Sequence, residues 1–90
     1  MYEIIPSGRF RKDYRIALKR GYNMNLLQRV VDQIAAGKPL DKKHRDHVLS
    51  GNFSGVRECH ITPDWLLLYD IHEEELELLL LRTGTHSDIF

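Results

Sequence analysis

The sequence predicts an α+β fold in the order β-α-α-β-β-β, with a mostly antiparallel sheet and a helical hairpin packed on it. Two stretches with helical periodicity follow a short first strand, between residues 7 and 37. Three apolar runs separated by short turns follow between residues 56 and 82, a spacing that favours antiparallel hairpins. Ninety residues support one hydrophobic core, so we expect a single domain over residues 1–90.

The first strand is expected at residues 2–5, where Tyr-Glu-Ile-Ile precedes Pro6. Ser7 is a candidate N-cap for the first helix, and Gly21 is placed to end it. Four apolar side chains recur at helical spacing and are expected to face the sheet: Phe10, Tyr14, Ala17 and Leu18.

A second helix is expected to begin after Asn23, which can cap it, and to stop at Gly37-Lys38-Pro39. Its apolar face follows the i, i+3, i+4, i+7 pattern through Leu27, Val30, Val31 and Ile34. Residues 38–55 are rich in Lys, His, Asp, Gly and Ser, so we expect a loop there.

Three strands are predicted in the remainder, at Val56–Ile61, Trp65–Ile71 and Leu76–Arg82, with turns at Pro63-Asp64 and His72–Glu75. The last two strands contain runs of leucine that are apolar on both faces. We therefore expect them to be central in the sheet, with helices covering at least one face.

The composition, with 42% apolar and 29% charged residues, is that of a folded globular protein. The longest apolar run, Trp65–Tyr69, is too short to span a bilayer, and the first twenty residues contain no apolar run typical of a secretory signal. The single cysteine, Cys59, excludes an internal disulfide and a cysteine-based zinc site. We expect a cytoplasmic protein without a membrane partner.

The charges are unevenly distributed although the net charge is zero. Residues 1–60 contain twelve Lys/Arg against six Asp/Glu, and residues 61–90 contain one Arg against seven Asp/Glu. A basic half can meet phosphate, whereas the neutral total argues against long-range attraction to bulk nucleic acid. Solvated helix faces that are rich in Lys and Arg are the simpler explanation of the cluster alone.

Three polar side chains are expected to meet at one edge of the sheet. His60 and Asp64 flank one hairpin turn, and His86 follows the third strand of the meander, which ends at that same edge. Two histidines, a carboxylate and the nearby Arg82 form a set that can cleave RNA by attack of a 2′-hydroxyl. The same histidines could form a metal-binding module, but no HxH or HExxH spacing supports it, so we expect no metal or cofactor.

The other candidate residues have competing explanations. His44 and His72 are interpreted as solvated loop residues. Cys59 alternates with His60 and is interpreted as a small buried apolar residue. Trp65 can pack the end of the hairpin or stack on a base, and Phe90 can contact RNA or the rim of its own site.

Three segments resemble, in order, motifs of the YafQ branch of the RelE toxin superfamily. Residues 45–51, Arg-Asp-His-Val-Leu-Ser-Gly, are similar to its KDHPLxG segment. Residues 55–65 are similar to its G-x-R-x-x-H-x-x-P-D-W stretch, and residues 82–86, Arg-Thr-Gly-Thr-His, match its RTGTH, with Phe90 four residues further on. Residues 1–40 match mainly in pattern.

The resemblance implies a RelE-like fold and a ribosome-dependent endoribonuclease that cuts mRNA in the decoding A site and arrests translation. It implies a cognate antitoxin as partner, the 70S ribosome with its mRNA as target, and operator DNA contacted only through the antitoxin. The implied catalytic residues are His47, His60, Asp64 and His86, and the implied RNA- or phosphate-binding residues are Arg82, Trp65 and Phe90.

By analogy, His86 is expected to protonate the leaving 5′-oxygen. His47 or Asp64 would act as the base or orient the 2′-hydroxyl, His60 would position the phosphate, and Arg82 would offset the developing charge. A non-enzymatic alternative is a ParE-like gyrase inhibitor or a repressor partner with the same fold. A metal-independent enzyme is favoured because an inhibitor does not need this set of side chains.

Overall fold

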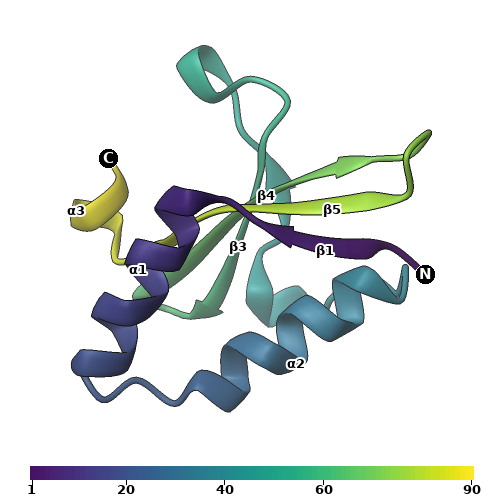
Figure 1. Ribbon diagram of the computed structural model, residues 1–90. Coiled ribbons are helices and arrows are strands. Elements are labelled where there is room, and N and C mark those ends of the chain that lie inside the picture. Colours follow the sequence, from purple (N-terminus) through teal and green to yellow (C-terminus); the bar gives the residue numbers. More distant parts are fainter.

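A computed structural model describes all residues, 1–90, as a five-stranded sheet with two helices on one face (Figure 1). The strands lie in the order β1-β5-β4-β3-β2. The strands are β1 (Glu3–Pro6), β2 (His47–Val48), β3 (Arg57–Thr62), β4 (Trp65–His72) and β5 (Glu77–Gly84). The helices are α1 (Gly8–Lys19), α2 (Met24–Ala35) and α3 (His86–Ile89), with short 3-10 turns at Lys42–His44 and Gly51–Phe53.

The sheet is mostly antiparallel, as predicted. β4 pairs antiparallel with both β3 and β5, and β2 pairs antiparallel with β3. β1 instead lies parallel to β5, with Glu3 opposite Glu77 and Pro6 opposite Leu80. The strands β3, β4 and β5 form a meander, because each is joined to the next by a short turn.

Helix α1 begins where the sequence predicts, but the face that it buries differs. The Ser7 hydroxyl accepts a hydrogen bond from the Phe10 amide at 3.0 Å and caps the helix. Phe10 and Ala17 are buried as expected, whereas Tyr14 and Leu18 are 40% and 56% exposed. Their expected place is taken by Asp13, which faces the sheet because Arg82 and the Thr83 amide bind its carboxylate.

Helix α2 agrees with the prediction in its cap and in its buried face. The Asn23 side chain accepts a hydrogen bond from the Asn25 amide at 3.1 Å. The predicted face is fully buried: Leu27, Val30, Val31 and Ile34. It packs over the side chains of β3, β4 and β5 in one continuous core.

The central strands are apolar on both faces, as predicted. Leu67 and Tyr69 point into the helix-covered core, while the intervening Leu66 and Leu68 point to the other face and are only 2% and 1% exposed. Cys59 is completely buried, and burial raises the pKa of its thiol to about 12. The thiol therefore behaves as a small apolar group, as expected.

Two elements were not predicted from the sequence. The loop of residues 38–55 contains β2, in which His47 lies opposite Glu58, and the C-terminal tail forms α3. A strand of two residues and a helix of four residues are too short to show periodicity. Each depends on bonds to the remainder of the fold.

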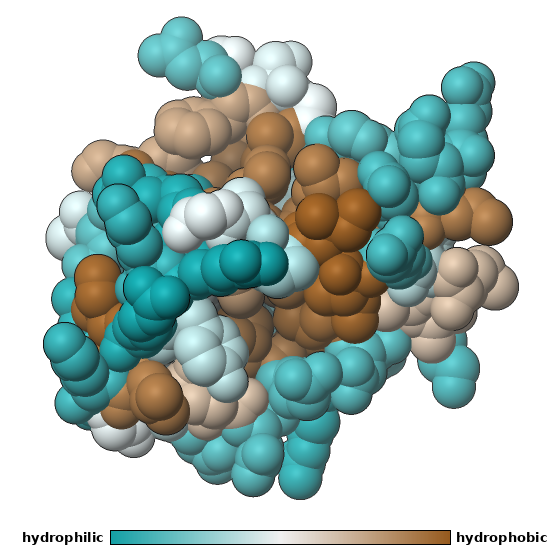
Figure 2. All heavy atoms as spheres, viewed as in Figure 1, coloured by the Kyte–Doolittle hydropathy of each residue, from teal (hydrophilic) through white to brown (hydrophobic).

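Most acidic residues of the second half lie away from the end of the sheet where the predicted site residues gather; Asp64 and Asp88 are the exceptions. The exposed Glu73, Glu74 and Glu75 form the β4–β5 turn, at the opposite end of β5 from Gly84. Figure 2 shows hydrophilic side chains over this turn and also along α1. None of the helices has the length and hydropathy required to cross a membrane.

Candidate active site

The structure brings His60, Asp64 and His86 together at one edge of the sheet, where they line a pocket of about 460 Å³. The register of the meander explains this convergence. Leu66 of β4 lies opposite His60 on one side and opposite Gly84 on the other. The end of β3, the following turn and the end of β5 therefore meet at the same edge.

His47 joins this edge through a carboxylate that was not predicted. Strand β2 places His47 opposite Glu58, and its Nε2 atom lies 3.4 Å from Glu58 Oε1. The Nε2 atom of His60 lies 3.7 Å from the same oxygen. The Glu58 side chain is only 8% exposed. Strand alternation contained the signal, since Glu58 and His60 are two residues apart and share a face.

Each of the two imidazoles lies between a backbone carbonyl oxygen and the Glu58 carboxylate. The Nδ1 atom of His47 lies 2.6 Å from the carbonyl oxygen of Arg45, and that of His60 lies 3.2 Å from the carbonyl oxygen of Pro63. A neutral imidazole has one N–H and can donate to only one of its two acceptors.

His86 and Phe90 lie at the two ends of α3. The His86 ring packs against the Phe90 ring, with centroids 4.9 Å apart, and Phe90 meets the edge of Phe53 at 5.2 Å. Phe90 thus contacts the rim of its own site, one of the two roles considered for it. Phe53, an aromatic residue in a polar loop, is a further rim residue that the sequence reasoning missed.

Trp65 occupies a core position, so the packing role considered for it is the one observed. Its side chain is 3% exposed, and its Nε1–H donates to Thr83 Oγ1 at 2.8 Å. A base cannot stack on an indole that is covered in this way. The ring instead packs on Tyr22, at 4.8 Å, and Tyr22 is the aromatic residue that lines the pocket.

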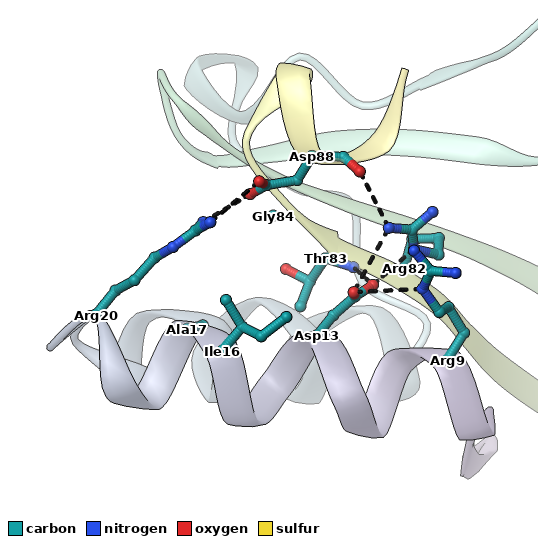
Figure 3. Close-up of a pocket in the computed structure, with 9 residues that line it drawn as sticks. All are labelled: Arg9, Asp13, Ile16, Ala17, Arg20, Arg82, Thr83, Gly84 and Asp88. Atoms are coloured by element: carbon teal, nitrogen blue, oxygen red, sulfur yellow. Dashed lines mark hydrogen bonds and ion pairs between the residues drawn. The ribbon is translucent and has the colours of Figure 1, made fainter.

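Arg82 lies outside the pocket, which differs from the expected position of a phosphate partner. Its Nε–H donates to Asp13 Oδ2 at 2.7 Å, and its Nη2 donates to the carbonyl oxygen of Asp88 at 3.2 Å. It lines a separate cavity of about 110 Å³ between α1 and the C-terminal segment (Figure 3). An additional residue in β5, Leu81, interrupts the alternation just before Arg82.

The two histidines interpreted as solvated have different environments. His72 pairs with Asp70 at 3.1 Å near the acidic turn, far from the pocket. His44 is half-buried, with its Nδ1 atom 2.7 Å from the carbonyl oxygen of His60. The interpretation of His44 as a purely solvated residue is therefore wrong, because it ties the loop of residues 38–55 to β3.

Asp46 is a second anchor of this loop, directly beside His47. Its carboxylate binds the Arg57 guanidinium at 3.2 Å and accepts a hydrogen bond from the Tyr69 hydroxyl. Burial, together with this carboxylate, raises the pKa of the Tyr69 hydroxyl above its ordinary value. Tyr69 therefore stays a hydrogen-bond donor at every physiological pH.

The polar side chains at this edge are spread over several segments. The structure contains no group of three His, Cys, Asp or Glu side chains arranged to hold a metal ion. What the edge does offer is two imidazoles around Glu58 and, beside them, a pocket with an exposed imidazole and an exposed carboxylate. Imidazoles and carboxylates are the side chains that most often serve as general acids and bases in enzymes.

Known proteins resemble this chain over its whole length. The family described as "Bacterial toxin of type II toxin-antitoxin system, YafQ" matches residues 2–90. The mRNA interferase toxin YafQ of Escherichia coli strain K12 is 36% identical over 89 residues, which cover 98% of this chain and 95% of that protein.

Solved structures of related toxins support the same family assignment. A metal-bound toxin from Helicobacter pylori is 43% identical, with a TM-score of 0.94 and complete coverage of both chains. YafQ in the E. coli DinJ–YafQ toxin–antitoxin complex is 36% identical, with a TM-score of 0.88 over 99% of this chain and 97% of that one. The protein described here is therefore a member of the YafQ family of bacterial toxins from type II toxin–antitoxin systems.

Proposed function

We propose that this chain is an mRNA interferase, an endoribonuclease that cleaves mRNA on the ribosome and stops translation. The observation that carries the proposal is the pocket formed by His60, Asp64 and His86 in a chain of the YafQ family. The E. coli relative is named for this activity. An inhibitor that acts only by binding does not require two imidazoles and a carboxylate around one cavity.

The proposed reaction is an internal transesterification of RNA. A base removes the proton of a 2′-hydroxyl, and the 2′-oxygen attacks the adjacent phosphorus. The bond from phosphorus to the 5′-oxygen breaks, and an acid protonates the leaving oxygen. The products are a 2′,3′-cyclic phosphate and a 5′-hydroxyl, so no metal is needed to balance the reaction.

We assign the acid to His86, because its ring is exposed at the pocket on the end of a short helix. Asp64 is exposed in the same pocket and is one candidate base; His47, beside Glu58, is the other. His60, held between Pro63 and Glu58, is suited to contact the phosphate. Arg82 reaches a phosphate there only by releasing Asp13, so its contribution is to the position of the C-terminal segment.

The proposed partners follow from the membership of the YafQ family. The E. coli relative has been crystallised with its antitoxin DinJ, and we propose a cognate antitoxin for this chain. The target is the 70S ribosome with its mRNA, and operator DNA is reached only through the antitoxin. A toxin that acts on translating ribosomes works in the cytoplasm.

Mapping mRNA 5′ ends in a reconstituted translation reaction tests the proposal. The wild-type protein should cut ribosome-bound mRNA, leaving 5′-hydroxyl ends, and EDTA at a level that spares the ribosome should not stop it. His86→Ala should lower the rate by at least about a hundredfold without a change in the folded structure. His72→Ala is the matched control, because it removes an exposed imidazole at the far end of the sheet.

Two outcomes would overturn the proposal. Cleavage by His86→Ala at the wild-type rate would remove the assigned acid. Absence of cuts with the wild-type protein, together with inhibition of DNA supercoiling by gyrase, would favour the binder with the same fold.

A further inference from the structure

The helix α3 is too short to be stable alone, yet it carries His86 and Phe90. Its four residues rely on an internal capping box. The Thr85 hydroxyl accepts from the Asp88 amide at 3.2 Å, and Asp88 Oδ2 accepts from the Thr85 amide at 2.8 Å. The box shapes the turn but does not hold it against the remainder of the protein.

The same carboxylate makes a second, stronger attachment. Arg20, at the end of α1, donates from Nη1 to Asp88 Oδ2 at 2.6 Å and from Nη2 to Asp88 Oδ1 at 3.1 Å (Figure 3). A two-pronged arginine–carboxylate pair defines orientation as well as distance. The hydrogen bonds from Arg20 and Thr85 hold the pKa of Asp88 well below its usual range, so the carboxylate is charged at neutral pH.

A second connection runs from α1 to α3 through Arg82. The buried Asp13 of α1 binds Arg82 Nε, and Arg82 Nη2 reaches the carbonyl oxygen of Asp88 at 3.2 Å. Figure 3 shows Arg20 and Arg82 approaching Asp88 from opposite sides. Residue 88 is thus held by its side chain and by its backbone.

Gly84 shows how closely this attachment is packed. A Cβ atom at residue 84 would lie 2.9 Å from Asp88 Oδ2, so any side chain there would displace the carboxylate. Gly84 has a φ of +154°, a conformation that glycine adopts readily. The carboxylate therefore sits directly on the backbone at the end of β5.

We propose that Arg20 and Asp88 form a clamp that fixes α3, and with it the His86 imidazole and the Phe90 ring, in the orientation used for cleavage. They are positioning residues and do not touch the substrate. The inference rests on the proposed function, because it assigns a catalytic role to His86. A pair that is 39% and 30% exposed contributes little to the free energy of unfolding. A shift of about 1 Å in a catalytic group, in contrast, can slow a reaction about a hundredfold.

Single-turnover cleavage at saturating ribosome–mRNA complex tests the clamp. Asp88→Asn keeps an acceptor for the Thr85 amide but loses the charge that Arg20 binds. Arg20→Ala, Asp88→Asn and the double variant should each lower the rate constant on the order of tenfold, and the double variant should be no slower than the slower single variant. Arg20→Lys should recover part of the rate. The concentration for half-saturation should change little.

Arg9→Ala is the matched control for charge. Arg9 lies on the same helix and lines the same cavity, but it pairs with Asp13 at 3.7 Å instead of with α3. Any general loss of attraction to RNA appears equally in Arg9→Ala and Arg20→Ala. The excess loss of rate in Arg20→Ala measures the clamp.

Nuclear Overhauser contacts between the Phe53 and Phe90 rings give an independent readout. They should weaken in Arg20→Ala and Asp88→Asn, while the thermal midpoint stays close to that of the wild type. Wild-type rates in both variants, or an equal loss in Arg9→Ala, would overturn the clamp. If the wild-type protein cleaves no mRNA, the proposed function fails, and the ring contacts still decide whether the pair fixes α3.

Discussion

The candidate catalytic side chains belong to two kinds of structure. His60 and Asp64 stand on the β3–β4 hairpin, where the backbone register determines their positions. His47 and His86 stand on short peripheral segments that individual side chains hold in place, through Asp46 for one and Asp88 for the other. Damage to the meander should therefore cause the largest loss of stability, whereas damage to an anchor should cause a smaller loss of stability and should also impair activity.

The largest effect on stability is expected in the meander. Leu67 is completely buried between the helices and the sheet. Leu67→Ala leaves a cavity and should lower the free energy of unfolding by about 2–5 kcal/mol, measured by urea denaturation. Leu18→Ala, at a leucine that is 56% exposed, is the control and should change it by less than about 1 kcal/mol. Similar losses in both variants would contradict the assigned core.

A large loss of activity with little loss of stability is expected at Glu58, which faces His60 of the hairpin and His47 of the peripheral strand β2. Glu58→Gln keeps the shape of the side chain but removes the charge that faces His47 and His60. Cleavage of ribosome-bound mRNA should fall on the order of ten- to a hundredfold. Glu77→Gln, at the far end of the sheet, should cleave at the wild-type rate. Full activity in Glu58→Gln would show that the shared carboxylate is not needed.

A smaller effect is expected at the anchor beside His47. Tyr69→Phe removes the hydroxyl that donates to Asp46, while Arg57 continues to bind the carboxylate. The free energy of unfolding should fall by about 1–2 kcal/mol, because a partly buried hydrogen bond to a charged group is lost. Tyr14→Phe removes a hydroxyl from a tyrosine that is 40% exposed and serves as the comparison. An equal change in both variants would argue against the anchor.

The smallest effect is the pH dependence of the clamp on α3. The pKa of Asp88 is lowered in the folded protein, so its contribution to stability is complete above the ordinary carboxyl pKa, about 4. That contribution disappears as the pH falls towards the folded value. The thermal midpoint of the wild type should exceed that of Asp88→Asn slightly at pH 6, and the difference should shrink below about pH 4. A difference that grows on acidification would have the wrong sign.

Much of the site was predictable from strand order alone. The meander places the turn after His60 and the segment after β5 at the same edge, so the meeting of His60, Asp64 and His86 follows from short connections and antiparallel pairing. Helix caps at Ser7 and Asn23 were equally local, because each hydroxyl or amide binds a backbone group within three residues.

The remainder required long-range contacts that no local pattern contains. Asp13 turns inward on α1 because Arg82, 69 residues further along, binds it. Trp65 is covered because Tyr22 packs on it from the linker between the helices. The sequence motifs indicated candidate residues for the site, but they did not distinguish a side chain that lines the pocket from one that supports it.

By itself, then, the amino-acid sequence determined the order of the first strand, the two long helices and the three-stranded meander. It also determined the helix caps, the core face of α2 and the family to which the chain belongs. These features depend on hydrophobic periodicity, turn chemistry and motifs, each of which involves residues that are close together in the sequence. Only the tertiary structure decided that Glu58 faces both His47 and His60, that Arg82 binds Asp13, and that Arg20 holds Asp88. The physical reason is that each polar side chain has several possible partners, and packing of distant segments selects among them.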